Sequence, residues 1–372
     1  MTSSAPGTAR PPTRGYSPAL DGLRALAVLA VLAYHSLGEL FPGGHVGVDV
    51  FFVLSGFLIT GILMREVERT GSISFKAFYA RRAIRLFPAL VLLVAVAAVA
   101  FAVIPVGDRA DEFRGLVAAV TYTSSPLQAA GVNLSSLGHA WSLSVEEYFY
   151  LVWPLLLLAV ARWWPHRLLA GTLSITAAAV LYQAAIGTFT SWPVDRVYYA
   201  PDTRAAQLLV GCSLAVLVAR GRAVARPFMA IVAIALITAF VLVEAMIGPR
   251  FYRDGGSTLV ALAAAVAISA VVHQPESRVA RTLAIGPLVW IGRRSYGIYL
   301  WGPVLATIVA TVVPHSAPLL PIILVLTFVV PALSFRFVEK PFLELKSRFE
   351  PRTNRADERP TPRVQSAQPE RQ

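Results

Sequence analysis

LDGLRALAVLAVLAYHS, residues 20–36, is an apolar run with an arginine near its start and a histidine near its end. Arg24 and His35 stand eleven positions apart. At about 100° per residue, these helical steps complete roughly three turns and rise about 16.5 Å. The spacing predicts that both side chains lie on one face of a membrane-crossing helix, near opposite ends. Ionisable groups inside such a segment are costly, so they are candidates for function.

The composition of the chain is that of a membrane protein. Hydrophobic residues make up 56% of the 372 residues and charged residues 15%, against about 25% charged residues in typical soluble domains. Apolar runs such as 86–104 reach the roughly 20 residues that cross a bilayer. The sequence predicts an all-α, polytopic membrane bundle in one domain, residues 16–349, between disordered tails at 1–15 and 350–372. The single cysteine, Cys212, rules out an intramolecular disulfide.

Ten transmembrane spans are expected from the apolar runs. They lie at 20–40, 46–64, 86–104, 146–161, 168–187, 204–219, 228–247, 257–272, 295–313 and 318–338. The segment 115–131 is also apolar, but it contains TYTSSPLQ, so we interpret it as a partial or re-entrant element. Counting it as a full crossing gives eleven spans, which is the alternative.

The basic residues that give the formal net charge of +12 are concentrated in loops on one side of the predicted membrane. Fifteen Lys and Arg residues lie in the loops 65–85, 162–167, 220–226 and 273–294, and five lie in the loops of the other side. Cytoplasmic loops carry such an excess, so both termini are expected in the cytoplasm. A nucleic-acid partner is not expected, because the basic residues separate apolar runs rather than form a soluble basic domain.

A turn brings a carboxylate towards His35. Pro42-Gly43-Gly44 is a turn signal, and Asp49 then opens the second apolar run, GVDVFFVLSGFLIT. We expect Asp49 to contact His35 across a helical hairpin, fixing the tautomer of the imidazole and leaving its other nitrogen free as a base. The alternative is a solvated Asp49 at a helix start, stabilised by the helix dipole, beside an interfacial histidine.

Two more polar clusters are expected on the same, outer side of the membrane. HAWSLSVEEYFY, residues 139–150, contains Trp141, Glu146 and Glu147, and YYAPDTR, residues 198–204, contains Asp202 and Arg204. Either serine of the first motif can cap the helix that follows, but capping leaves its histidine, Trp141 and the second glutamate unexplained. Polar groups that converge on one side suggest a shared cavity. Trp141, Asp202 and Arg204 are its candidate substrate-binding residues.

The cytoplasmic side has a different character. Arg82 and Arg85, in ARRAIRLFP, stand three residues apart and are therefore neighbours on a helix. Two planar guanidinium forks on one face suit phosphate groups. The alternative is anchoring by the positive-inside rule. Arg24 is harder to explain in that way, because it lies just inside an apolar run.

Taken in order, these motifs resemble the acyltransferase-3 family of integral-membrane O-acyltransferases, from about residue 16 to 345. They are LDGLRALAVLAVLAYHS, GVDVFFVLSGFLIT, ARRAIRLFP, HAWSLSVEEYFYLVWP, PDTRAAQLLVGC, IGRRSYGIYLW and FVEKPF. The resemblance implies an acyl-CoA donor, often acetyl-CoA, on the cytoplasmic side of a bacterial plasma membrane. It implies transfer of the acyl group to a hydroxyl, commonly on a sugar. No metal ion is expected.

The resemblance also carries functional residues onto this chain. The family positions fall on Arg24, His35, Asp49, Arg82 and Arg85, and, with less certain roles, on Glu146 or Glu147 and Glu339. One departure is clear: family members often have histidine after Tyr-Leu-Trp, where this chain has Gly302. We also expect a stand-alone form, without the hydrolase-like domain that some relatives append.

A mechanistic hypothesis follows. The phosphates of the donor lie near Arg82 and Arg85, Arg24 steadies the phosphates or the thioester, and His35 removes the acceptor proton as the hydroxyl attacks. A covalent acyl intermediate on His35 or a serine is an alternative. The acceptor is an envelope glycan or a glycosylated metabolite. A transporter or flippase for a glycan is the rival function, but it does not explain the arginines that face the cytoplasm.

Overall fold

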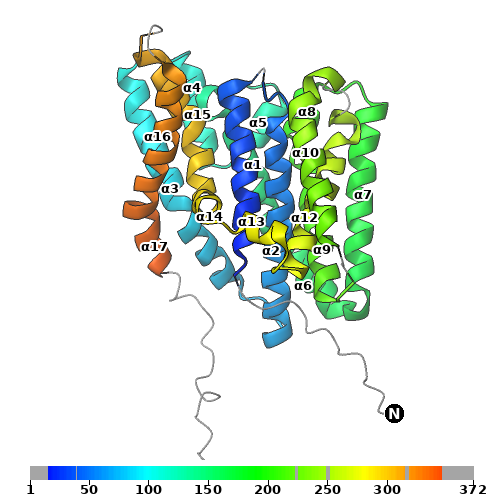
Figure 1. Ribbon diagram of the computed structural model, residues 1–372. Coiled ribbons are helices and arrows are strands. Elements are labelled where there is room, and N and C mark those ends of the chain that lie inside the picture. Colours follow the sequence, from blue (N-terminus) through cyan, green and yellow to red (C-terminus); the bar gives the residue numbers. More distant parts are fainter. Residues whose placement is uncertain (1–15, 39, 223–224, 249–251, 315–317, 346–372) are drawn as a thin grey trace, which may run out of the picture.

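The chain forms a bundle of helices, shown as a computed structural model in Figure 1. The structure describes residues 16–38, 40–222, 225–248, 252–314 and 318–345. These residues contain helices and no strand, so the all-α prediction is confirmed for them. The tails predicted to be disordered, 1–15 and 350–372, lie outside the described residues.

Ten helices of the described chain are long and apolar enough to cross a membrane, as the sequence predicts. Some reach this length together with a short helical turn that continues them. They are built on α1 (Pro18–Leu37), α2 (Gly47–Thr70), α3 (Phe75–Val103), α6 (Trp141–Trp163), α7 (Leu168–Phe189), α9 (Pro201–Ala219), α10 (Pro227–Ile247), α12 (Ser257–His273), α15 (Ser295–Val312) and α16 (Leu319–Ser334).

The segment 115–131 does not cross the bundle. It is divided between α4 (Arg109–Val120) and α5 (Ser124–Ala129). The 12 residues of α4 give a length of only about 18 Å, well short of a hydrocarbon core of about 30 Å. The count of ten spans and the interpretation of this segment as a partial element are therefore confirmed.

Short helices close the bundle at one end. α13 (Arg278–Leu283) and α14 (Gly286–Arg293) pack against the first turns of α1. The start of α1 and α17 (Lys340–Glu344) lie at this same end, low in Figure 1, as an even number of spans requires. We name it the basic end, because α2, α6 and α12 end here and the chain around these ends is rich in Arg and Lys. At the other end lie α8 (Val194–Tyr199), the turn η1 (Gly44–Val46) and the turn η2 (Ser135–Ala140).

α2 and α9 form the centre of the bundle, and α10 and α16 are the most exposed of the ten spans. The two central helices approach closely at a pair of glycines. A Cβ atom on Gly56 would overlap the backbone carbonyl of Leu208, and one on Gly211 would overlap the carbonyl of Val53. Small residues at such crossings let helix backbones pack in a bilayer. The pair fixes the distance between the two helices that carry much of the site described below.

Replacing either Gly56 or Gly211 with alanine is expected to lower thermal stability in detergent, because the added methyl group must push two backbones apart. Overpacking of this kind costs about 1–3 kcal/mol. Gly61→Ala, on the same helix α2, is the matched control: its Cβ would meet nothing closer than an Arg65 nitrogen at 3.5 Å. Equal melting temperatures for Gly56→Ala and Gly61→Ala would contradict the close crossing.

Candidate active site

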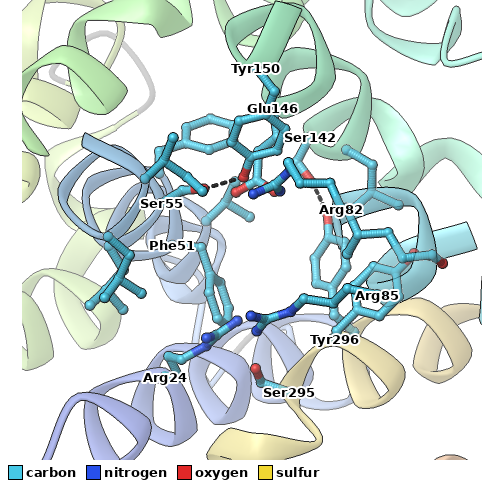
Figure 2. A pocket seen from close by; sticks show the side chains of 18 of the residues that line it. Arg24, Phe51, Ser55, Arg82, Arg85, Ser142, Glu146, Tyr150, Ser295 and Tyr296 are labelled. Atoms are coloured by element: carbon cyan, nitrogen blue, oxygen red, sulfur yellow. Dashed lines mark hydrogen bonds between the residues drawn. The ribbon is translucent and has the colours of Figure 1, made fainter. Parts of the chain in front are cut away.

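An inner cavity of about 240 Å³ lies among α1, α2, α3, α6 and α15. Arg24, Arg82 and Arg85 line it, and we name it the arginine cavity. Figure 2 shows Arg24 and Arg85 pointing towards each other on one side of it, with Arg82 beside Glu146 on the opposite side. The structure thus brings together the three arginines that the sequence analysis proposed for phosphate binding, and it adds one carboxylate.

The three guanidinium groups share one nearby carboxylate, Glu146, which lies beside Arg82 (Figure 2). Among the residues that the structure describes, none of them forms an ion pair with a carboxylate. The buried Nε atoms of Arg24 and Arg82 have no hydrogen-bond partner among the described residues. Buried charges are normally paired, since leaving them unpaired costs free energy. The cavity therefore suits an anion that brings several negative charges with it.

An aromatic side chain holds Arg82 in place. Its guanidinium carbon lies 3.1 Å from the centroid of the Tyr150 ring, a cation–π contact. The Tyr150 hydroxyl is in turn hydrogen-bonded to Ser55. Ser142, Glu146 and Tyr150 recur at every fourth position of α6 and all line the cavity, as one face of a helix allows.

A second, larger cavity of about 720 Å³ lies towards the other end of the bundle. His35, His45 and His139 line it together with Trp141 and Arg204, and we name it the histidine cavity. Its lining also includes Tyr34, Tyr198 and Tyr199, together with Val194 and Asp195 of α8. Flat aromatic faces and a few polar groups are the ordinary lining of a small-molecule site.

The local geometry of His35 makes one ring nitrogen available as a base. Its Nδ1 atom lies 2.8 Å from the Val31 carbonyl oxygen, one helical turn earlier. A carbonyl oxygen can only accept, so Nδ1 carries the proton in the neutral ring and Nε2 keeps its lone pair. The tautomer of His35 is therefore fixed by the Val31 carbonyl of its own helix, and not by Asp49 as the sequence predicted.

The predicted contact between Asp49 and His35 is wrong. Asp49 is fully buried, and its Oδ1 atom accepts from Nη2 of Arg204 at 2.6 Å. Arg204 is only 1% exposed, so this is a buried ion pair between α2 and α9. The reason is rotation along the helix. Val48 faces both cavities, and the next residue points about 100° away, towards α9.

Breaking the buried pair is expected to be strongly destabilising. Asp49→Ala removes the carboxylate that accepts from the buried Arg204 guanidinium, and removing one partner of a buried ion pair typically costs about 3–5 kcal/mol. Asp202→Ala is the matched control, because Asp202 pairs with Arg196 at 2.8 Å on an exposed surface, where such a pair contributes about 0–1 kcal/mol. Melting temperatures in detergent measure the difference. Equal losses in the two variants would contradict the assignment.

The other proposed site residues divide between the two cavities and the surface. Trp141 and Arg204 line the histidine cavity, and Glu146 lines the arginine cavity. Glu147 lines neither of the two. Asp202 also lies outside both, held by the two terminal nitrogens of Arg196 and by the Tyr182 hydroxyl.

The serines of the motif 139–150 do not cap a helix. α6 begins at Trp141 directly after the turn η2, with no side-chain cap, and the Ser142 hydroxyl bonds to the hydroxyl of Tyr299 instead.

Gly302 lies near His35, across a void of about 10 Å³. Glu339 is buried and accepts a hydrogen bond from Ser334.

Several polar residues of the arginine cavity were not predicted from the sequence, among them Ser55, Tyr150 and Tyr299. The sequence contains features that could have identified the first two. Tyr150 stands four positions after Glu146 and so shares its helix face, and Ser55 is a lone hydroxyl within an apolar run. Tyr299 has no such feature, because its partners are 157 and 160 positions away in sequence.

Comparison with known proteins finds a family and several relatives that this chain resembles. The family described as "Acyltransferase domain" matches residues 17–336. The Peptidoglycan O-acetyltransferase OatA of Listeria monocytogenes is 38% identical over 358 residues, covering 88% of this chain and 56% of the relative. The O-acetyltransferase OatA of Staphylococcus aureus is 32% identical over 345 residues, covering 88% and 57%. The chain thus spans little more than half the length of these relatives. No solved structure matches it significantly.

Proposed function

The chain belongs to the acyltransferase-3 family, and on that premise we propose that it is a membrane O-acyltransferase that moves an acetyl group from acetyl-CoA to a hydroxyl of a glycan. The observation that carries the proposal is the arginine cavity. Arg24 from α1 and Arg82 and Arg85 from α3 converge on one space, where none of them forms an ion pair within the part of the chain that the structure describes.

The donor assignment rests on charge and shape. Guanidinium groups are planar donors that bind phosphate oxygens in pairs. The negatively charged diphosphate of coenzyme A can pair with the three arginines. The pantetheine arm of coenzyme A is slender enough to pass between helices. We assign the basic end of the bundle to the cytoplasm of a bacterial cell, where the excess of Arg and Lys belongs and where both termini then lie.

The acceptor assignment rests on the histidine cavity. Trp141, Tyr198 and Tyr199 contact one another edge-on or at a tilt, with ring centroids 4.8–5.3 Å apart. Such a wall offers apolar ring faces to the C–H groups of a sugar, and Asp195 and Glu244 add carboxylates for its hydroxyls. The relatives named peptidoglycan O-acetyltransferases and O-acetyltransferases favour a glycan as the acceptor.

The chemistry needs one base. The acceptor oxygen attacks the thioester carbonyl, a C–O bond forms, and His35 Nε2 takes the hydroxyl proton. Collapse of the intermediate breaks the C–S bond, and the coenzyme A thiolate receives the proton from His35. General-base assistance of this kind contributes about 10²–10⁴-fold in rate.

Purified protein with radiolabelled acetyl-CoA and a soluble peptidoglycan fragment tests the proposal. We expect free thiol to appear together with label on the glycan, and both to depend on the acceptor. A transporter or flippase would bind the glycan without releasing thiol. That outcome would overturn the proposed function.

A further inference from the structure

The arginine and histidine cavities have two lining residues in common, Val48 and Tyr299. Tyr299 extends from α15, and Val48 lies in the first turn of α2. Both side chains are buried, Tyr299 with 8% of its surface exposed. Tyr299 is therefore the large side chain that borders both cavities, and the Phe52 ring of the arginine cavity packs against the Trp141 ring of the histidine cavity with centroids 5.9 Å apart.

Hydrogen bonds hold this ring at the seam. The Tyr299 hydroxyl donates to the His139 carbonyl oxygen at 2.6 Å and is bonded to the Ser142 hydroxyl at 2.7 Å. His139 lines the histidine cavity, whereas Ser142 lines the arginine cavity and lies on the opposite side of it from Arg24 and Ser295 in Figure 2. One phenol hydroxyl thus bonds to both sides of the boundary.

Two more contacts fix α15 against the junction of η2 and α6. The His139 ring packs edge-on against the Tyr299 ring with centroids 5.5 Å apart. His139 Nε2 lies 3.0 Å from the Leu300 carbonyl oxygen. The backbone on both sides of the seam is therefore fixed, and the Tyr299 ring is held between the two sides by its hydroxyl and by the His139 ring.

We propose that Tyr299 is the septum between the donor and acceptor cavities, and that the acetyl group crosses the protein at the point where its ring meets Val48. This inference rests on the proposed function, in which the arginine cavity holds the donor. Tyr299 acts as a positioning residue: while its two hydrogen bonds hold, water from the histidine cavity does not reach the thioester. Excluding water in this way prevents hydrolysis of a reactive group.

Cysteine accessibility tests the septum without any enzymatic activity. Ser55→Cys places a thiol in the arginine cavity of a chain whose single native cysteine, Cys212, is buried. A charged, membrane-impermeant methanethiosulfonate added from the outer side is expected to label this thiol about tenfold faster when Tyr299→Ala is also present, because a close-packed wall has been opened.

Tyr296→Ala is the matched control, because Tyr296 lines the arginine cavity but not the histidine cavity, and it should leave the labelling rate unchanged. If Tyr299→Ala is not recovered as a monodisperse protein, Tyr299→Leu is read in the same way. Equal labelling rates with and without the Tyr299 substitution would overturn the septum.

Turnover gives an independent readout. In Tyr299→Ala, water can attack the thioester, giving acetate and the free thiol, so thiol release without acceptor should rise while transfer to the glycan falls. Tyr299→Phe keeps the ring but loses both hydrogen bonds of the hydroxyl, so its acceptor-independent release should lie between those of the wild type and Tyr299→Ala. A tyrosine with a merely structural role would lose both reactions together. A wild-type protein without any turnover would refute the proposed function, and the labelling experiment would still decide the septum.

Discussion

Replacing His35 with alanine is expected to lower acetyl transfer to the glycan by about 10²–10⁴-fold, the range that a general base contributes, without weakening the binding of acetyl-CoA. The reason is the position of the residue. His35 lines the histidine cavity and not the arginine cavity, and its Nε2 atom is the nitrogen left available by the bond from Nδ1 to Val31. Transfer rates and equilibrium binding of acetyl-CoA measure the two effects separately.

His273 provides a matched control for this experiment. It also ends a transmembrane helix and also directs Nδ1 at the carbonyl oxygen four residues earlier, at 2.9 Å from Ser269. It lines neither cavity, so His273→Ala should transfer acetyl groups at the wild-type rate. Wild-type transfer by His35→Ala would contradict the assignment of His35 as the base.

Neutralising the arginines of α3 is expected to have the second large effect. A hydrogen bond to a charged group contributes about 1.5–3 kcal/mol, so Arg82→Gln and Arg85→Gln should each weaken acetyl-CoA binding by about 10- to 150-fold. The ligand-free protein should not lose stability through lost charge pairing, because neither arginine has a carboxylate partner among the described residues. Binding isotherms and melting temperatures of the ligand-free variants test both statements.

Arg81 is the control next to Arg82 in the sequence. Its side chain points to Glu66, with the two groups 3.4 Å apart, and it does not line the arginine cavity. Arg81→Gln should therefore lower stability without changing the affinity for acetyl-CoA. Wild-type affinity in Arg82→Gln and Arg85→Gln would contradict a phosphate-binding role for the cavity.

The fold could be predicted from the sequence to a large extent, because hydropathy and length decide which segments cross a membrane. The ten spans follow from them, and so does the interpretation of 115–131, whose polar TYTSSPLQ interrupts the helix between α4 and α5. Hydropathy cannot reveal how closely two spans pack. The approach of α2 and α9 at Gly56 and Gly211 depends on contacts that only the folded chain makes.

The site could be predicted only in part, because sequence spacing fixes neighbours on one helix but not the rotation of that helix in the bundle. Arg82 and Arg85 are neighbours by spacing, and the structure adds Arg24 from α1. The hairpin brings the end of α1 near the start of α2, yet the rotation of α2 directs Asp49 to Arg204 rather than to His35. Roles in catalysis stay predictions for all of these residues.

The proposed reaction requires above all that the arginine cavity binds the phosphates of the donor. Equilibrium binding of acetyl-CoA and of S-acetylpantetheine, which lacks the phosphates, tests it most directly in the wild type and in the double variant Arg82→Gln/Arg85→Gln. We predict that the wild type binds acetyl-CoA far more tightly than S-acetylpantetheine, and that the double variant binds the two with similar, weak affinity. Equal affinities of the wild type for both compounds would contradict the account.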